Sequence, residues 1–113
     1  DFEKILENAR ACGVPYKNII LDGGIGFAKT SEQNLELLKN YGALRKFGFP
    51  LLLGLSRKRM VKNVFGENFE DGTLAFNCYS MARGSADIFR THEVGKHKLF
   101  ARGIGELNLQ NEW

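Results

Sequence analysis

The sequence has few cysteines, no long apolar run and little net charge, and each shortage excludes a class of protein. Its 113 residues include only Cys12 and Cys78, which no spacing rule pairs, so we expect a reducing, cytoplasmic location. No apolar stretch approaches the roughly 20 residues that a membrane span needs, so we expect no membrane partner. The formal charge of +3, from 16 basic and 13 acidic residues, argues against a nucleic-acid partner but suits a small anionic ligand.

The sequence does contain a regular alternation of apolar strands and amphipathic helices. Strands are expected at 18–22, 50–55 and 86–91, and helices at 2–12, 31–47, 60–65, 72–83 and 94–107. The strand centres Ile19, Leu51 and Ile88 are 32 and 37 positions apart, with a helix in each gap. This rhythm predicts parallel strands joined by crossovers. The spacing approximates the repeat of an eight-fold β/α barrel, about 31 residues per unit.

The predicted fold class is therefore α/β, a partial (β/α)8 TIM barrel with three parallel strands alternating with helices. A flavodoxin-like or Rossmann fold has a similar rhythm, but it needs more strands than 113 residues supply here. The chain starts at Asp1, without an initiator methionine and within an expected helix, so we expect a fragment of a longer domain.

Each expected strand ends in side chains that suit ligand chemistry. They are Asp22 after the first strand, Ser56, Arg57 and Lys58 after the second, and Arg90, Thr91, His92 and Glu93 after the third. Because parallel strands bring their carboxyl ends to one edge of a sheet, we expect these groups to form one joint site. An alternative for the second group is that Ser56 only caps the next helix and the two cations are solvated.

The sequence nearly matches two known motifs but satisfies neither. The loop at 23–30 nearly fits the P-loop pattern, but Ala28 replaces the second glycine and no Walker B carboxylate follows, so an NTPase is disfavoured. His92 and His97 are one residue too far apart for the zinc motif H-E-x-x-H, since five helical positions turn about 140°. We therefore expect no metal site here, an exposed His97, and His92 as an anion contact.

Three stretches make the sequence resemble the carboxyl-terminal portion of dihydropteroate synthase, a folate-pathway family. They are residues 20–30 (ILDGGIGFAKT), 53–58 (LGLSRK) and 90–94 (RTHEV). The resemblance implies that residues 1–113 are the incomplete carboxyl-terminal part of a pterin-binding TIM-barrel domain, containing its sixth, seventh and eighth strands. It also implies a transferase that condenses 6-hydroxymethyl-7,8-dihydropterin pyrophosphate with p-aminobenzoate to give 7,8-dihydropteroate.

The resemblance further implies roles for single residues. The substrate-binding residues it implies are Asp22, Phe27, Gly54, Ser56, Arg57, Lys58, Arg90 and His92, with Lys58, Arg90 and His92 also catalytic. Asp22 and Lys58 would bind the pterin, Phe27 and Arg57 would wall the pocket, and Arg90 and His92 would hold the pyrophosphate. Mg²⁺ is expected as a cofactor, with its ligands outside this chain. Gly23 stands where the family usually has proline, so we expect a looser loop there.

Three hypotheses on the function remain open, and the first is the synthase fragment described above. The isolated chain is expected to be inactive, and either to self-associate or to need the missing amino-terminal part of the barrel, because an open parallel sheet leaves two unpaired edges. A non-catalytic pterin or anion-binding module, or a decayed paralogue, is the alternative. A pterin-dependent methyltransferase is disfavoured by the stretch Ser56-Arg57-Lys58 together with Arg90 and His92, because a methyl donor has no pyrophosphate to hold.

Overall fold

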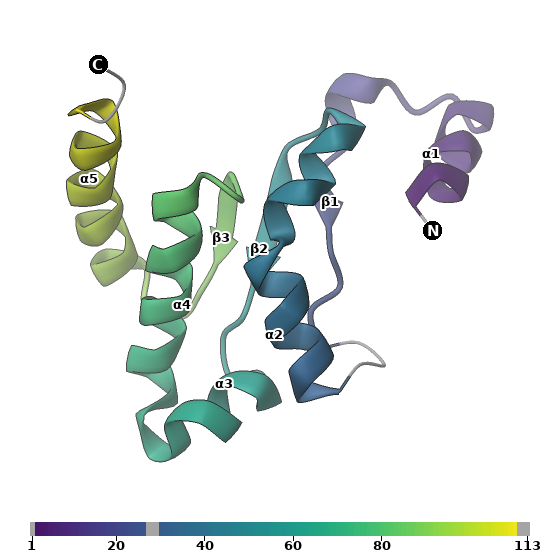
Figure 1. Ribbon diagram of the computed structural model, residues 1–113. Coiled ribbons are helices and arrows are strands. Elements are labelled where there is room, and N and C mark those ends of the chain that lie inside the picture. Colours follow the sequence, from purple (N-terminus) through teal and green to yellow (C-terminus); the bar gives the residue numbers. More distant parts are fainter. Residues whose placement is uncertain (1, 27–29, 111–113) are drawn as a thin grey trace.

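The structure, a computed structural model that describes residues 2–26 and 30–110, contains a three-stranded parallel sheet with helices between the strands (Figure 1). The strands are β1 (Leu21–Asp22), β2 (Leu51–Gly54) and β3 (Ile88–Arg90), in the order β1-β2-β3. Both neighbouring pairs are parallel, with Gly54 opposite Arg90. All three carboxyl ends therefore lie at one edge of the sheet, as the alternation of strands and helices predicted.

The helices follow the predicted order with shifted boundaries. They are α1 (Phe2–Ala11), α2 (Ser31–Lys39), α3 (Arg59–Phe65), α4 (Phe69–Arg83) and α5 (Val94–Gln110), with 3-10 turns η1 (Tyr16–Asn18), η2 (Tyr41–Phe47) and η3 (Gly66–Asn68). Because η1 takes up Asn18, β1 is shorter than expected. The helix expected at 31–47 divides into α2 and η2, and α4 begins three residues earlier than predicted. No helix in the described part is long and apolar enough to cross a bilayer.

Local sequence sets where α2 begins and where η2 ends. Thr30 caps α2 in a reciprocal box, in which its Oγ1 accepts from Gln33 N at 3.1 Å and Gln33 Oε1 accepts from Thr30 N at 3.0 Å. Gly48 ends η2 with φ of 80°, a left-handed conformation that favours glycine. Thr30 and Gly48 thus mark the two ends of the helical segment that lies between β1 and β2.

The core lies between the helices and one face of the sheet. Leu21, Leu51 and Leu53 point into it and are buried, together with Leu55 and Met60 near α3. Because side chains alternate along a strand, the intervening residues share the other face. They are Asp22, Leu52, Gly54, Ile88 and Arg90. Ile88 on this second face is 38% exposed, so the helices cover only one side of the sheet.

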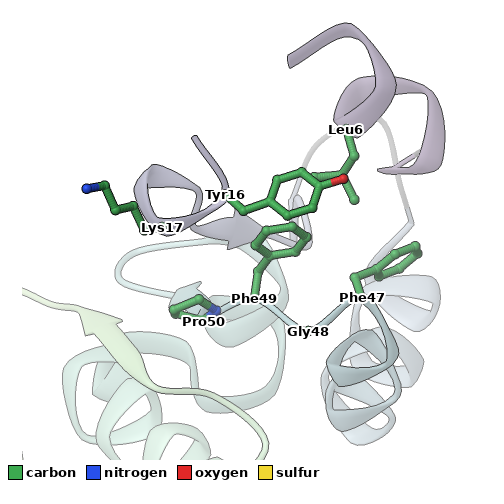
Figure 2. Close-up of a pocket in the computed structure, with 7 residues that line it drawn as sticks. All are labelled: Leu6, Tyr16, Lys17, Phe47, Gly48, Phe49 and Pro50. Carbon is green, nitrogen blue, oxygen red and sulfur yellow. The ribbon is translucent and has the colours of Figure 1, made fainter. Parts of the chain in front are cut away.

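An apolar hollow lies beside the segments that precede β1 and β2 (Figure 2). It has a volume of about 510 Å³. Its lining comprises Leu6, Tyr16, Lys17, Phe47, Gly48, Phe49 and Pro50. Tyr16 meets Phe49 edge to face, with ring centroids 5.4 Å apart, and Leu6 brings α1 to the same hollow. The ring contact thus joins η1 to the segment before β2, and Leu6 places α1 on the same hollow.

Asp87 joins three segments at the same end of the sheet. Its carboxylate accepts from Leu51 N at 2.9 Å and forms a two-pronged ion pair with Arg45, at 3.0 and 3.1 Å. The hydrogen bonds from Arg45, and to a smaller extent from Leu51 N, lower the pKa of Asp87 below its usual value, although desolvation opposes them. Asp87 therefore ties the starts of β2 and β3 to η2.

Candidate functional site

The residues that end β2 and β3 line a hollow at the carboxyl edge of the sheet. Its volume is about 290 Å³, close to the lower limit for small-ligand sites. Its lining comprises Gly54, Ser56, Lys58, Arg90, Thr91 and His92. Five of the eight residues that the resemblance implied therefore meet in one place, and Thr91 joins them.

Arg90 extends its guanidinium group across β2 because Gly54 has no side chain. A Cβ at Gly54 would lie 3.0 Å from Arg90 Nη2 and 3.2 Å from Nε. Among residues 2–26 and 30–110, the ion pairs are Arg45 with Asp87 and Arg57 with Glu70, so no described carboxylate neutralises Arg90. An arginine in a hollow without a carboxylate partner is suited to bind an external anion.

Asp22 and Lys58 both bond to the loop that follows β1. Asp22 Oδ1 accepts from Gly24 N at 2.9 Å, and Lys58 Nζ donates to the Ile25 carbonyl at 2.7 Å. Gly26 leaves room for the lysine stem, since a Cβ there would lie 2.8 Å from Lys58 Cδ. Asp22 also lies on the same face of the sheet as Arg90, by the strand register. The acid and the cations therefore occupy one rim of the sheet.

Ser56 and Arg57 have partners that the sequence did not predict. Ser56 Oγ accepts from His92 N at 3.3 Å, so it joins the ends of β2 and β3 and does not cap α3. Arg57 adopts a left-handed conformation, with φ of 58°, and its Nε lies 3.2 Å from Glu70 Oε1 on α4. Arg57 is not among the residues that line the hollow. Phe27, the other predicted wall residue, lies outside the described residues.

Tyr41 is a site residue that sequence reasoning placed only in an apolar stripe. Its hydroxyl donates to the Leu52 carbonyl and accepts from Gly23 N at 2.7 Å. Burial raises the pKa of Tyr41 to about 12, which keeps the hydroxyl protonated. A Cβ at Gly23 would lie 2.4 Å from Tyr41 Cε1, so the ring requires glycine there. A buried tyrosine usually finds a polar partner, and that rule could have identified Tyr41 from its position in the stripe.

The described part of the loop after β1, residues 23–26, is hydrogen-bonded to η2 and α2, while the looser loop expected from Gly23 stays a prediction. Tyr41 binds the Gly23 N–H, a donor that proline lacks. Asn34, buried on α2, accepts from Gly26 N at 2.9 Å through Oδ1. Hydrogen bonds to side chains on η2 and α2 thus hold the backbone of residues 23–26.

The prediction that His97 is exposed was wrong. His97 is 5% exposed and packs against α4, where Asn77 Nδ2 lies 2.8 Å from its Nε2. Its Nδ1 lies 2.7 Å from the Glu93 carbonyl. The charged neighbours Lys96 and Lys98 suggested a basic, solvated face, but the helix turns His97 inward between them because adjacent residues are about 100° apart.

Magnesium is the expected cofactor, and carboxylate side chains are its usual protein ligands. Within the ranges 2–26 and 30–110, no three histidine, cysteine, aspartate or glutamate side chains gather so that they could hold a metal ion. Magnesium as a cofactor, with its ligands outside this chain, therefore stays a prediction, and no step of the chemistry is assigned to it.

Comparisons with known proteins agree with this arrangement. Residues 1–92 match the family model described as pterin binding enzyme. The chain is 40% identical to dihydropteroate synthase of Clostridium beijerinckii over 97 residues, which are 83% of this chain and 36% of the relative. It is 44% identical to that of Streptococcus pyogenes serotype M6 over 100 residues, 84% of this chain and 37% of the relative. The chain thus spans about a third of the length of these relatives.

A solved structure extends the similarity to three dimensions. Clostridium difficile dihydropteroate synthase, determined in the presence of pteroic acid, superposes with a TM-score of 0.88 and 36% identity, covering 94% of this chain and 41% of that one. The three strands and their helices are accordingly part of a (β/α)8 barrel, as predicted.

The parallel sheet with helices between its strands places the chain among β/α barrel proteins. Within this class the chain belongs to the pterin binding enzyme family. The relatives described above are dihydropteroate synthases of the folate pathway, so the resemblance seen in the three motif stretches is confirmed.

Proposed function

We propose that this chain forms the carboxyl-terminal wall of the substrate site of a dihydropteroate synthase. In this proposal residues 1–113 are the last three β/α units of a pterin-binding barrel domain. The observation that carries the proposal is the shared rim on which Asp22, Lys58, Arg90 and His92 lie. An anion-binding hollow beside an exposed carboxylate suits a ligand with a polar heterocycle at one end and a phosphate group at the other.

Asp22 and Lys58 would recognise the pterin. A carboxylate accepts two parallel hydrogen bonds, which matches the amino group and adjacent ring N–H of a pterin. The bonds from Gly23 N to the Tyr41 hydroxyl and from Gly24 N to Asp22 would fix the direction of this carboxylate. Lys58 Nζ, already at the loop after β1, would donate to the pterin carbonyl and a ring nitrogen.

Arg90 and His92 would bind the pyrophosphate and stabilise its departure. In the reaction the amine nitrogen of p-aminobenzoate forms a bond to the pterin methylene carbon, and the carbon–oxygen bond to pyrophosphate breaks. The leaving group takes the electron pair and the amine loses a proton. Donors already directed at the oxygens that gain charge lower the barrier, because they need little reorganisation. The placement of Arg90 over Gly54 provides such a donor.

In this proposal a large part of the substrate site is formed by residues outside this chain. Since the relatives are about three times as long, the opposite wall and any Mg²⁺ ligands would come from segments that this chain does not match. We therefore propose that the 113 residues alone are inactive. We further propose that the sheet face that carries the exposed Ile88 promotes self-association or pairing with the rest of a barrel. A cytoplasmic location stays a prediction.

A chimaera tests the proposed activity. The amino-terminal part of the Clostridium beijerinckii synthase, up to the start of the matched region, is joined to this chain, and 7,8-dihydropteroate formation is measured. We expect turnover, a loss of at least about a hundred-fold with Arg90→Ala or Lys58→Ala, and little change with the control Arg102→Ala on the exposed part of α5. A folded chimaera with no turnover would contradict the proposal.

Pyrophosphate binding separates the enzyme from the alternative of a non-catalytic module. Calorimetry of the 113-residue chain with inorganic pyrophosphate should show binding that Arg90→Ala abolishes. Binding together with an active chimaera supports the synthase. Binding with an inactive chimaera supports an anion-binding module.

A further inference from the structure

A connected series of polar groups extends from the interface of α4 and α5 to the strand-end hollow. Asn77, fully buried on α4, lies 2.8 Å from His97 Nε2 on α5. His97 Nδ1 lies 2.7 Å from the Glu93 carbonyl and 3.4 Å from Thr91 Oγ1. Thr91 Oγ1 lies 3.5 Å from Ser56 Oγ. Thr91 and Ser56 line the hollow, so the series connects buried and solvent-accessible groups.

The partners of His97 determine which of its nitrogens carries hydrogen. A carbonyl oxygen only accepts, so the contact with Glu93 requires a hydrogen on Nδ1. In the neutral ring Nε2 then accepts, and Asn77 presents its Nδ2 donor to it. Both ring nitrogens are therefore satisfied in one tautomer.

The segment 91–93 is held from both sides by these groups. From the α5 side, His97 binds the Glu93 carbonyl, while Thr91 Oγ1 accepts from Glu93 N at 3.2 Å. From the β2 side, Ser56 Oγ accepts from His92 N at 3.3 Å. Because His92 lines the hollow directly after β3, the conformation of this turn decides where its side chain and backbone point.

We propose that His97 is a positioning residue for the anion site, a role that rests on the proposed function. Its Nδ1–H holds the turn at 91–93, so that His92 and Arg90 present their donors to a pyrophosphate group together. Packing between α4 and α5 alone does not require an imidazole there, because a buried polar pair adds little net stability over a well-packed apolar pair. In this proposal the imidazole of His97 maintains the geometry of the hollow and is not needed for the packing of α4 against α5.

The test measures binding of inorganic pyrophosphate to the 113-residue chain and to three variants. His97→Phe keeps a ring in the interface and removes both hydrogen bonds, and we expect affinity to fall roughly ten-fold. His97→Asn retains an amide donor near the Nδ1 position, and we expect recovery to within about three-fold of the unmodified chain. The control Thr73→Val, on α4, removes only a bond to the Phe69 carbonyl, and we expect less than about a two-fold change.

The outcomes separate this inference from the proposed function. Unchanged affinity in His97→Phe, while Arg90→Ala loses binding, would overturn the inference and leave the proposed function standing. Equal losses in Thr73→Val and His97→Phe would also overturn it, since destabilised packing would then explain both. If His97→Phe does not fold, long-range proton–nitrogen NMR of the unmodified chain decides: hydrogen on Nδ1 is expected, and hydrogen on Nε2 would overturn the inference. No pyrophosphate binding by the unmodified chain would overturn both proposals.

Discussion

Removal of the Tyr41 hydroxyl should destabilise the fold and the loop that carries Asp22. Tyr41→Phe leaves the Leu52 carbonyl without its phenol donor and the Gly23 N–H without its acceptor. A buried polar group that loses its partner costs about 1–3 kcal/mol. Both groups are partly buried, so we expect a loss of about 2 kcal/mol in the free energy of unfolding. That is a large share of the roughly 5–15 kcal/mol typical of a domain.

Urea denaturation at pH 8 measures this loss, and Tyr79→Phe is the matched control. Tyr79 on α4 is 39% exposed, so we expect a change below about 0.5 kcal/mol. An equal effect of the two substitutions would refute the role given to Tyr41.

The pH dependence provides an independent check on the same hydroxyl. The pKa of Tyr41 is about 12 in the folded chain and about 10 in the unfolded chain, so its stabilising contribution is complete below pH 10 and is lost as the pH rises towards 12. At pH 11 the free energy of unfolding should have fallen by about 1 kcal/mol more in the unmodified chain than in Tyr41→Phe. Parallel pH profiles would show that the phenol is not buried as described.

Two further substitutions test other contacts of the sheet. Gly54→Ala places a methyl group 3.0 Å from Arg90 Nη2, so the pyrophosphate affinity measured by calorimetry should fall roughly three- to ten-fold. The control is Gly103→Ala, whose methyl group meets nothing within 4 Å and should leave the affinity unchanged. Equal affinities would show that the guanidinium position does not matter. Asp87→Asn should lower the urea midpoint at pH 7, because it removes the ion pair with Arg45. The pKa of Asp87 is lowered by folding, so the carboxylate stabilises the fold above pH 3.8 and loses this effect as acid protonates it. The difference between the two chains should therefore shrink as the pH falls below 3.8. A difference that persists in acid would contradict the ion pair with Arg45.

The sequence predicted the order of elements well because apolar periodicity records burial directly. The run at 51–55 is buried at four of five positions, and its ends are marked by Pro50 and Ser56. The 3-10 turns were missed because their residues have the same periodicity over a short stretch as an α-helix or a strand. Asn18 was therefore assigned to a strand and Tyr41 to a continuous helix.

The candidate site was predictable where it depends on strand ends and unpredictable where it depends on tertiary contacts. Parallel pairing brings the ends of β2 and β3 side by side, and with them Lys58, Arg90 and His92. The partner of Arg57 is on α4, and the inward turn of His97 depends on how α5 packs, and neither is encoded in local spacing. Motif reasoning therefore located the hollow but not the groups that support it.

The most direct test of the central claim is an NMR titration of the chain with 6-hydroxymethyl-7,8-dihydropterin pyrophosphate. The account predicts that amide signals after all three strands, those of Gly24, Ser56 and His92, shift together along one saturation curve, while Gly13 near α1 does not move. Shifts after one strand only, or separate curves for the three loops, would contradict a single site at the carboxyl edge of the sheet.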